Sequence, residues 1–201
     1  MDKPKQISCT AFKDNQRVAA GNLLQVASKV KEIIEQDELA SILIFDDVTS
    51  ELVELDFRGT VREVLERLEK STAIMEPAKA LSDADVRPQR GPGRPKLGVV
   101  AREVTLLPRH WDWLNSQSGG ASVALRKLVE EARRVNSDKD KVRQAKEVTY
   151  RFMSAMAGNF PGFEEATRAL FADDAGRFNN LVAAWPVDIR DHVRKLADAA
   201  F

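Results

Sequence analysis

Apolar side chains recur at helical spacing in two stretches of the first seventy residues. After Asn22 they fall three or four positions apart, and a second such stretch begins at Thr60, where Thr60 and Glu63 fit a capping box. The first stretch comprises Leu23, Val26, Ala27, Val30, Ile33 and Ile34, and the second Val61, Val64, Leu65 and Leu68. The pattern therefore predicts two one-faced helices, each with a capping residue at its start.

Three short apolar runs in the same region are typical of strands. Residues 7–12 and 41–45 have this pattern, and 52–57 resumes it after the turn-forming segment 46–50. The last two runs are therefore predicted to pair as a hairpin. We expect residues 1–70 to form one small α+β domain.

Proline and glycine replace the periodic pattern between residues 71 and 98, which leaves too little apolar surface to offset the entropy of ordering. This segment is predicted to be a disordered basic linker. Residues 99–136 then form a predicted strand–helix–helix module, with an extended segment at 99–107 and helices that begin at Pro108 and Ser122.

A break at Asn136-Ser137-Asp138 is predicted to end that module, and residues 137–201 are predicted to be a C-terminal helical region. Within it, 158–162 and Trp185-Pro186 are expected to interrupt the helices. The predicted fold class is α+β, with a small N-terminal α+β domain, the linker, the strand–helix–helix module and the helical region in that order.

Charge is unevenly distributed along the 201-residue chain, although 31 basic and 31 acidic residues balance overall. The net charge is −6 over residues 1–86, +6 over 87–136 and zero over 137–201. Clustered lysine and arginine raise the local concentration of polyanions. The middle segment therefore points to an anionic partner, with a solvated basic linker as the alternative.

Several classes of protein are disfavoured by residue usage. The single cysteine, Cys9, rules out an internal disulfide, and the two histidines, His110 and His192, are far apart in sequence, so we expect neither a metal nor a cofactor. No apolar run reaches the roughly 18 residues of a membrane span. The first residues also lack the apolar stretch of a secretory signal, so a cytoplasmic protein without membrane contact is expected.

The most specific local motif is the sequence Arg-Pro-Gln-Arg-Gly-Pro-Gly-Arg-Pro-Lys at 87–96. Its Gly-Arg-Pro core resembles the AT-hook, whose central arginine lies in the minor groove of A·T-rich DNA. This resemblance implies DNA contacts by Arg90, Arg94 and Lys96. Pro92 stands where the usual pattern has arginine.

The segment that follows resembles the ribbon-helix-helix fold. Arg-Glu-Val-Thr-Leu-Leu-Pro at 102–108 matches the ribbon and the proline-initiated first helix, and Gly-Gly-Ala-Ser at 119–122 matches the turn and the cap of the second helix. The resemblance implies a homodimer whose paired strands enter the major groove and whose second helix grips phosphate with its N-terminus. Arg102 and Ser122 are the candidate contacts.

Two registers of this ribbon remain open. If Leu107 faces the core, alternation places Leu106, Val104 and Arg102 toward DNA. The opposite register buries Val104 and Leu106 but presents Glu103 and Thr105 to the groove, where a carboxylate can accept only from cytosine. A dimerisation module that binds no nucleic acid is the alternative.

Over nearly its whole length the chain resembles an uncharacterised bacterial family known only as a domain of unknown function. The segments that carry this resemblance are 8–12, 44–47, 93–98, 102–111, 119–122, 150–157 and 161–167. The resemblance implies a bacterial cytosolic protein and brings no activity with it.

We therefore expect a non-enzymatic, dimeric DNA-binding or regulatory protein that uses Arg90, Arg94, Lys96, Arg102 and Ser122, with A·T-rich DNA favoured by the AT-hook-like segment and another protein or a signal bound by the terminal domains. The alternative is a protein–protein interaction or dimerisation module. A third reading, an enzyme acting through Asp46, Asp47 or His192, would need a pocket that joins those residues.

Overall fold

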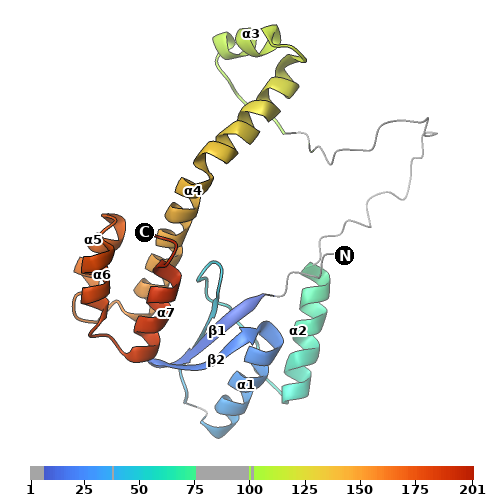
Figure 1. Cartoon of the computed structure of the whole chain (residues 1–201). Helices are drawn as coiled ribbons and strands as arrows, with labels where there is room; N and C mark the ends of the chain where they lie inside the picture. The colour runs from blue at the N-terminus through green and yellow to red at the C-terminus, as the bar shows by residue number, and fades with distance from the viewer. Residues whose placement is uncertain (1–6, 38, 76–99, 101) are drawn as a thin grey trace, which may run out of the picture. The chain divides into compact units, whose positions relative to one another are not determined.

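A computed structural model describes residues 7–37, 39–75, 100 and 102–201, with the backbone alone for 71–75 (Figure 1). The chain divides into two compact units, one made of Met1–Glu76 with Asp138–Phe201 and the other of Pro77–Ser137. A small antiparallel sheet and several helices confirm the α+β class. The proposed linker, 71–98, lies mostly outside the described residues.

The sheet of the first unit has the order β2-β1-β3 and is antiparallel throughout. β1 spans Ser8–Lys13, β2 spans Gln16–Asn22 and β3 spans Ile42–Asp46. The predicted strands at 7–12 and 41–45 are confirmed, whereas β2 was not predicted. Asp14 turns the chain between β1 and β2 with φ +50°, a conformation that aspartate tolerates better than most residues.

The predicted hairpin between 41–45 and 52–57 is confirmed only at its turn end, because β3 pairs over its whole length with β1 and residues 52–57 form no full strand. A single bridge joins Phe45 to Leu52, and the amide of Val53 donates to the Ile44 carbonyl 2.8 Å away. The two faces of β3 supply Ile44 and Phe45 to the two cores of this unit, whereas the acidic side chains of 51–56 are exposed.

The first predicted helix is α1, Leu23–Gln36, and its cap is confirmed. The Asn22 side chain accepts from the Gln25 amide at 2.9 Å, and the Gln25 side chain accepts in return from the Asn22 amide at 3.3 Å. Reciprocal bonds of this kind satisfy amides that have no intrahelical acceptor. The spacing of its apolar residues places Val26, Ala27 and Val30 in the core.

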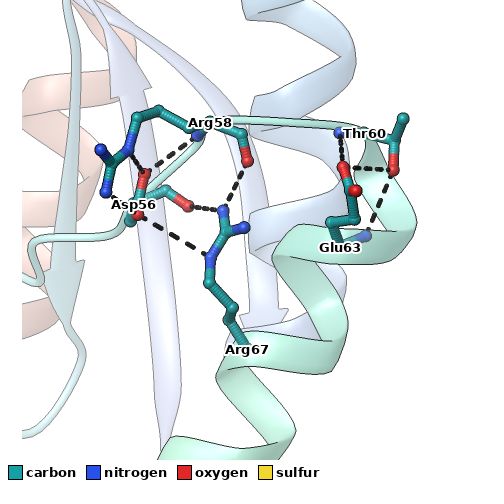
Figure 2. Close-up of polar contacts among 5 residues, drawn as sticks. All are labelled: Asp56, Arg58, Thr60, Glu63 and Arg67. Carbon is teal, nitrogen blue, oxygen red and sulfur yellow. Dashed lines mark hydrogen bonds and ion pairs between the residues drawn. The ribbon is translucent and has the colours of Figure 1, made fainter.

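The second predicted helix is α2, Val61–Met75, and Figure 2 shows the capping box at its start. The Glu63 carboxylate accepts from the Thr60 amide at 2.8 Å, while the Thr60 hydroxyl accepts from the Glu63 amide at 3.3 Å. The Thr60 amide and the Thr60 hydroxyl both donate to this carboxylate, and they hold the pKa of Glu63 below its usual value. One turn further on, the Arg67 guanidinium donates to the carbonyls of Asp56 and Arg58, which ties the preceding loop to the helix (Figure 2).

The C-terminal part of this unit is helical, as predicted. α5 spans Phe163–Phe171, α6 spans Ala175–Val182 and α7 spans Val187–Ala197. The predicted interruptions at 158–162 and at Trp185-Pro186 fall between helices. Asp174 caps α6 by accepting from the Arg177 amide at 2.9 Å.

The predicted break at Asn136-Ser137-Asp138 is wrong: α4 is one helix from Gly120 to Met156. The Asn136 side chain donates to the Ala132 carbonyl at 2.9 Å, which keeps this residue within the helix. Oppositely charged side chains three residues apart flank it on both sides, namely Glu130 with Arg133, Glu131 with Arg134, Asp138 with Lys141 and Asp140 with Arg143. Several such pairs support a helix segment that is polar on all sides.

The two faces of the sheet bury different cores. Cys9, Ala11 and Ile44 pack with the apolar face of α1, whereas Phe12 and Phe45 pack with residues of α4 to α7. On that second side the Phe152 ring lies 5.3 Å from Phe12 and 4.9 Å from Phe45, centroid to centroid. The described residues of 7–70 and 138–201 therefore share one core.

Candidate functional site

The basic segment folds, where it is described, into two helices joined by a glycine turn. α3 spans Pro108–Ser116, and α4 begins at Gly120, two residues before the predicted start at Ser122. Pro108 supplies the first helical position, where its missing N–H is not needed. Gly119 has φ +90°, which only glycine adopts without strain.

Residues 102–107 belong to no strand within the described chain. Leu107 nevertheless has extended dihedrals, φ −66° and ψ 150°, at the start of α3. Leu106 is half-buried, whereas Val104 and Leu107 are about half exposed, at 52% and 49%. Neither of the two predicted ribbon registers is therefore selected by burial in the single chain.

This unit exposes more large apolar side chains than it buries. Among the residues that the structure describes in it, the buried apolar side chains are Leu114 and Ala124. Seven large apolar side chains are exposed: Val100, Val104, Leu107, Trp113, Leu128, Val129 and Val135. Large apolar side chains exposed in this number, with few buried ones in the same unit, point to a surface that another molecule covers. We call the unit Pro77–Ser137 the α3–α4 unit, although α4 continues beyond it, and we refer to these seven residues together as its apolar face.

Cations of the unit fall into two groups. Arg133 and Arg134 are paired with Glu130 and Glu131 on their own helix. The second group is exposed, and no carboxylate of the described chain lies within ion-pair distance of it: Arg102, Arg109, Arg126 and Lys127. The unpaired cations therefore lie on both sides of the glycine turn.

Of the five predicted DNA contacts, the structure describes two. Arg102 is exposed just before α3, and Ser122 is exposed in the first turn of α4, where the amides have no intrahelical acceptor. Ser122 is the third residue of α4 rather than its cap. Arg90, Arg94 and Lys96 lie outside the described residues. Sequence reasoning missed Arg126 and Lys127, which their place one turn after Ser122 could have indicated.

Asp46 and Asp47, the candidate carboxylates of the enzyme reading, serve the turn after β3. Asp46 accepts from the amides of Val48 and Thr49, both at 2.8 Å, in the way that aspartate stabilises turns. Asp47 accepts from the hydroxyls of Ser8 at 2.7 Å and Thr10 at 2.6 Å, and so fastens the turn to β1. Burial, with help from both carboxylates, raises the pKa of the Cys9 thiol to about 11, so this cysteine is protonated at neutral pH.

His192 lies in the core of the first unit, between the rings of Phe12 and Phe152. Burial, together with the charge of Lys195, lowers the pKa of His192 to about 4. At neutral pH the imidazole is therefore uncharged.

Two further searches concern the described residues only. No cluster of three or more histidine, cysteine or carboxylate side chains in them could hold a metal ion. No helix among them is long and apolar enough to cross a membrane.

The described residues define an α+β protein in which a two-helix unit presents both unpaired cations and exposed large apolar side chains. A family model described as "Uncharacterized protein conserved in bacteria (DUF2239)" matches residues 8–197, and the chain belongs to this family. The predicted membership of an uncharacterised bacterial family is thereby confirmed. Neither a curated protein nor a solved structure matches the chain.

Proposed function

We propose that the chain is a dimeric, non-enzymatic DNA-binding protein with a regulatory role, and that its α3–α4 unit contacts the duplex. The observation that carries this proposal is the group of exposed, unpaired cations around the glycine turn, Arg102, Arg109, Arg126 and Lys127. Cations that a protein does not neutralise itself are available to phosphate, and phosphate neutralisation supplies most of the affinity of non-specific DNA binding.

The apolar face supports a second copy of the chain as the partner of this unit. Two buried apolar side chains are too few for the core of a folded module, and the exposed residues Trp113, Leu128 and Val129 would add to that core if another copy covered them. Segment 102–107 pairs with no strand among the described residues, so pairing with the same segment of a second copy would satisfy its backbone groups.

The start of α4 supports phosphate binding in the same unit. Its first amides, including that of Ser122, carry the positive end of the helix dipole. One turn later, Arg126 donates to the Ser122 carbonyl at 3.1 Å, which places its charge next to those amides. A phosphate at this position would meet hydrogen-bond donors and a cation together.

A steep salt dependence is the first expected result. If about five phosphate contacts form, log K for binding to a duplex should fall against log salt with a slope near −4.5, because each contact contributes roughly −0.9. Fluorescence anisotropy over a range of salt concentrations measures this slope. Arg102→Ala should make it shallower by about 0.9, whereas Lys29→Ala, on α1, should leave it unchanged. A flat salt response of the unmodified protein would contradict DNA binding.

The AT-hook-like segment makes a separate prediction about base composition. Arg94→Ala should weaken binding to an A·T-rich duplex more than to a G·C-rich duplex, since the narrow minor groove of A-tracts attracts arginine most strongly. The same anisotropy titration on the two duplexes tests this. Equal losses on both would restrict Arg94 to phosphate contacts or to none.

The alternative function is a protein–protein interaction or dimerisation module without nucleic acid, and the apolar face favours it as well. Nuclease treatment separates the two proposals. If the full chain, immobilised by a tag, retains its partners after nuclease, those partners bind protein. If they are lost, DNA or RNA holds them.

A further inference from the structure

An open groove of about 500 Å³ lies in the first unit, between α4 and the C-terminal end of α5. It is lined by Asp138, Lys139, Val142, Arg143, Lys146, Glu147 and Phe171. This volume is within the range of small-molecule sites, about 300–1,000 Å³. Six of these residues lie on the C-terminal half of α4, and none lies within Pro77–Ser137, the unit that contains the proposed DNA contacts, so the groove is separate from those contacts.

The groove presents an aromatic ring to solvent. Phe171 is 50% exposed, and its described ring contact is the edge of Tyr150, 5.8 Å away centroid to centroid. Val142 and the aliphatic parts of the lysine and arginine side chains supply the rest of the apolar lining. A planar apolar ligand would cover the Phe171 ring and gain both buried area and ring stacking.

Most charges around the groove are already neutralised by neighbouring side chains. The Lys146 ammonium lies 2.6 Å from the Asp173 carboxylate, and Arg143 lies 3.0 Å from Asp140 and 3.6 Å from Glu147. The Lys146 side chain is only 11% exposed, so this ion pair is a fixed part of the wall.

Lys139 is the exception. Asp138, the adjacent carboxylate of the lining, is paired with Lys141 at 3.1 Å. No carboxylate of the described chain lies within ion-pair distance of the Lys139 ammonium, which is exposed at the groove. The lining of the groove therefore includes one available positive charge and one exposed aromatic ring.

We propose that this groove binds a small aromatic carboxylate, with the ligand ring against Phe171 and its carboxylate at Lys139. The uncompensated charge selects an anion over a neutral or cationic ligand, and the exposed ring selects an aromatic over an aliphatic one. The single available cation matches a monocarboxylate. This proposal does not depend on DNA binding, because no residue is shared between the two sites.

Titration of the full chain with 1-naphthoate, followed by calorimetry, tests the proposal. We expect saturable binding of one ligand per chain with Kd on the order of 100 µM. Phe171→Ala should weaken binding by about tenfold or more, because the stacking partner and its apolar area are lost. Phe171→Leu keeps the apolar bulk without the ring, and an intermediate affinity is expected.

A neutral analogue separates the charge from the ring. Lys139→Gln should weaken 1-naphthoate by about twofold to fivefold, as expected for one exposed ion pair, and leave 1-naphthamide unchanged. Phe201→Ala removes another exposed aromatic side chain of the same unit and should change neither affinity. Far-UV circular dichroism verifies that each variant is folded.

Three results would overturn the proposal. The first is no saturable binding of 1-naphthoate to the unmodified chain at millimolar concentration, and the second is a Phe171→Ala variant that binds 1-naphthoate as tightly as the unmodified chain. The third is that 1-naphthamide binds as tightly as 1-naphthoate and that Lys139→Gln changes the affinity for neither. The first two reject the groove as the site, and the third rejects the carboxylate as the ligand class.

Discussion

Replacing Phe152 by alanine is expected to lower the free energy of unfolding by about 3–5 kcal/mol, the cost of a large cavity in a packed core. The ring is fully buried and contacts Phe12 of β1, Phe45 of β3 and His192 of α7. Elements from both ends of the chain thus depend on one side chain. Urea unfolding at neutral pH, followed by circular dichroism, measures the loss.

Hydrogen exchange gives the second measurement for this variant. If the two ends of the chain form one cooperative unit, protection should fall together in β1, β3 and α5 to α7. Phe171→Ala is the matched control, because that ring is 50% exposed and should cost less than about 1 kcal/mol. Protection lost from the helices alone would show that the sheet is stable without them. Phe152→Leu provides a milder variant if Phe152→Ala fails to fold.

Acidification is expected to destabilise the protein through His192. The pKa of this imidazole is about 4 in the folded chain against 6.5 when solvated, so between these values the unfolded state binds a proton that the folded state does not. Stability is therefore complete above pH 6.5 and falls as the pH drops toward 4, by about 3 kcal/mol for this group. Burial is the largest cause; the charges of Lys195 and Arg17 lower this pKa further, and Asp47 opposes them.

The difference between two proteins isolates this effect from that of the carboxylates. His192→Phe keeps an aromatic ring between Phe12 and Phe152 but has no group to protonate, so its stability should depend less on pH over the same range. Urea unfolding at several pH values between 7 and 4 measures both. His110→Asn, an exposed histidine of α3, should behave like the unmodified chain. Parallel curves for unmodified and His192→Phe proteins would contradict a buried neutral imidazole.

The sequence predicted those parts of the fold that depend on hydrogen bonds and apolar contacts between residues close together in the chain. The helices at α1 and α2 follow from apolar spacing, and their starts follow from Asn22 and from Thr60 with Glu63. β2 was missed because its residues, Gln16–Asn22, contain little apolar pattern. The signal that could have revealed it is Asp14-Asn15, a turn pair directly after a predicted strand.

Long-range structure was harder to predict. β3 pairs over its whole length with β1 and only at one bridge with 52–57, and the choice between these neighbours depends on packing that no local pattern describes. The burial of His192 likewise follows from α7 packing onto Phe12 and Phe152, residues far away in the sequence. Asn136-Ser137-Asp138 was interpreted as a break because those residue types favour turns, but the charge pairs around them stabilise the helix.

The features of the candidate site likewise differ in how far the sequence could predict them. Arg102 and Ser122 were proposed as DNA contacts from the sequence and stay a proposal, whereas the apolar face became visible only when burial was known for each side chain. Sequence spacing alone assigns such residues to a core, since it does not show whether the core is complete within one chain. The groove at Phe171 was not predicted, because its walls come from α4 and α5 and its charge balance depends on their packing.

The first unit is built from two stretches of the chain that are not consecutive in sequence. Its sheet and its last helices are separated in sequence by the segment Pro77–Ser137, which therefore has the topology of an insertion. Closing such a loop costs little extra as it lengthens, about 0.6 kcal/mol for each doubling. The inserted segment could therefore be replaced or lengthened during evolution while the first unit still folds. Differences in length among relatives should be concentrated in this segment.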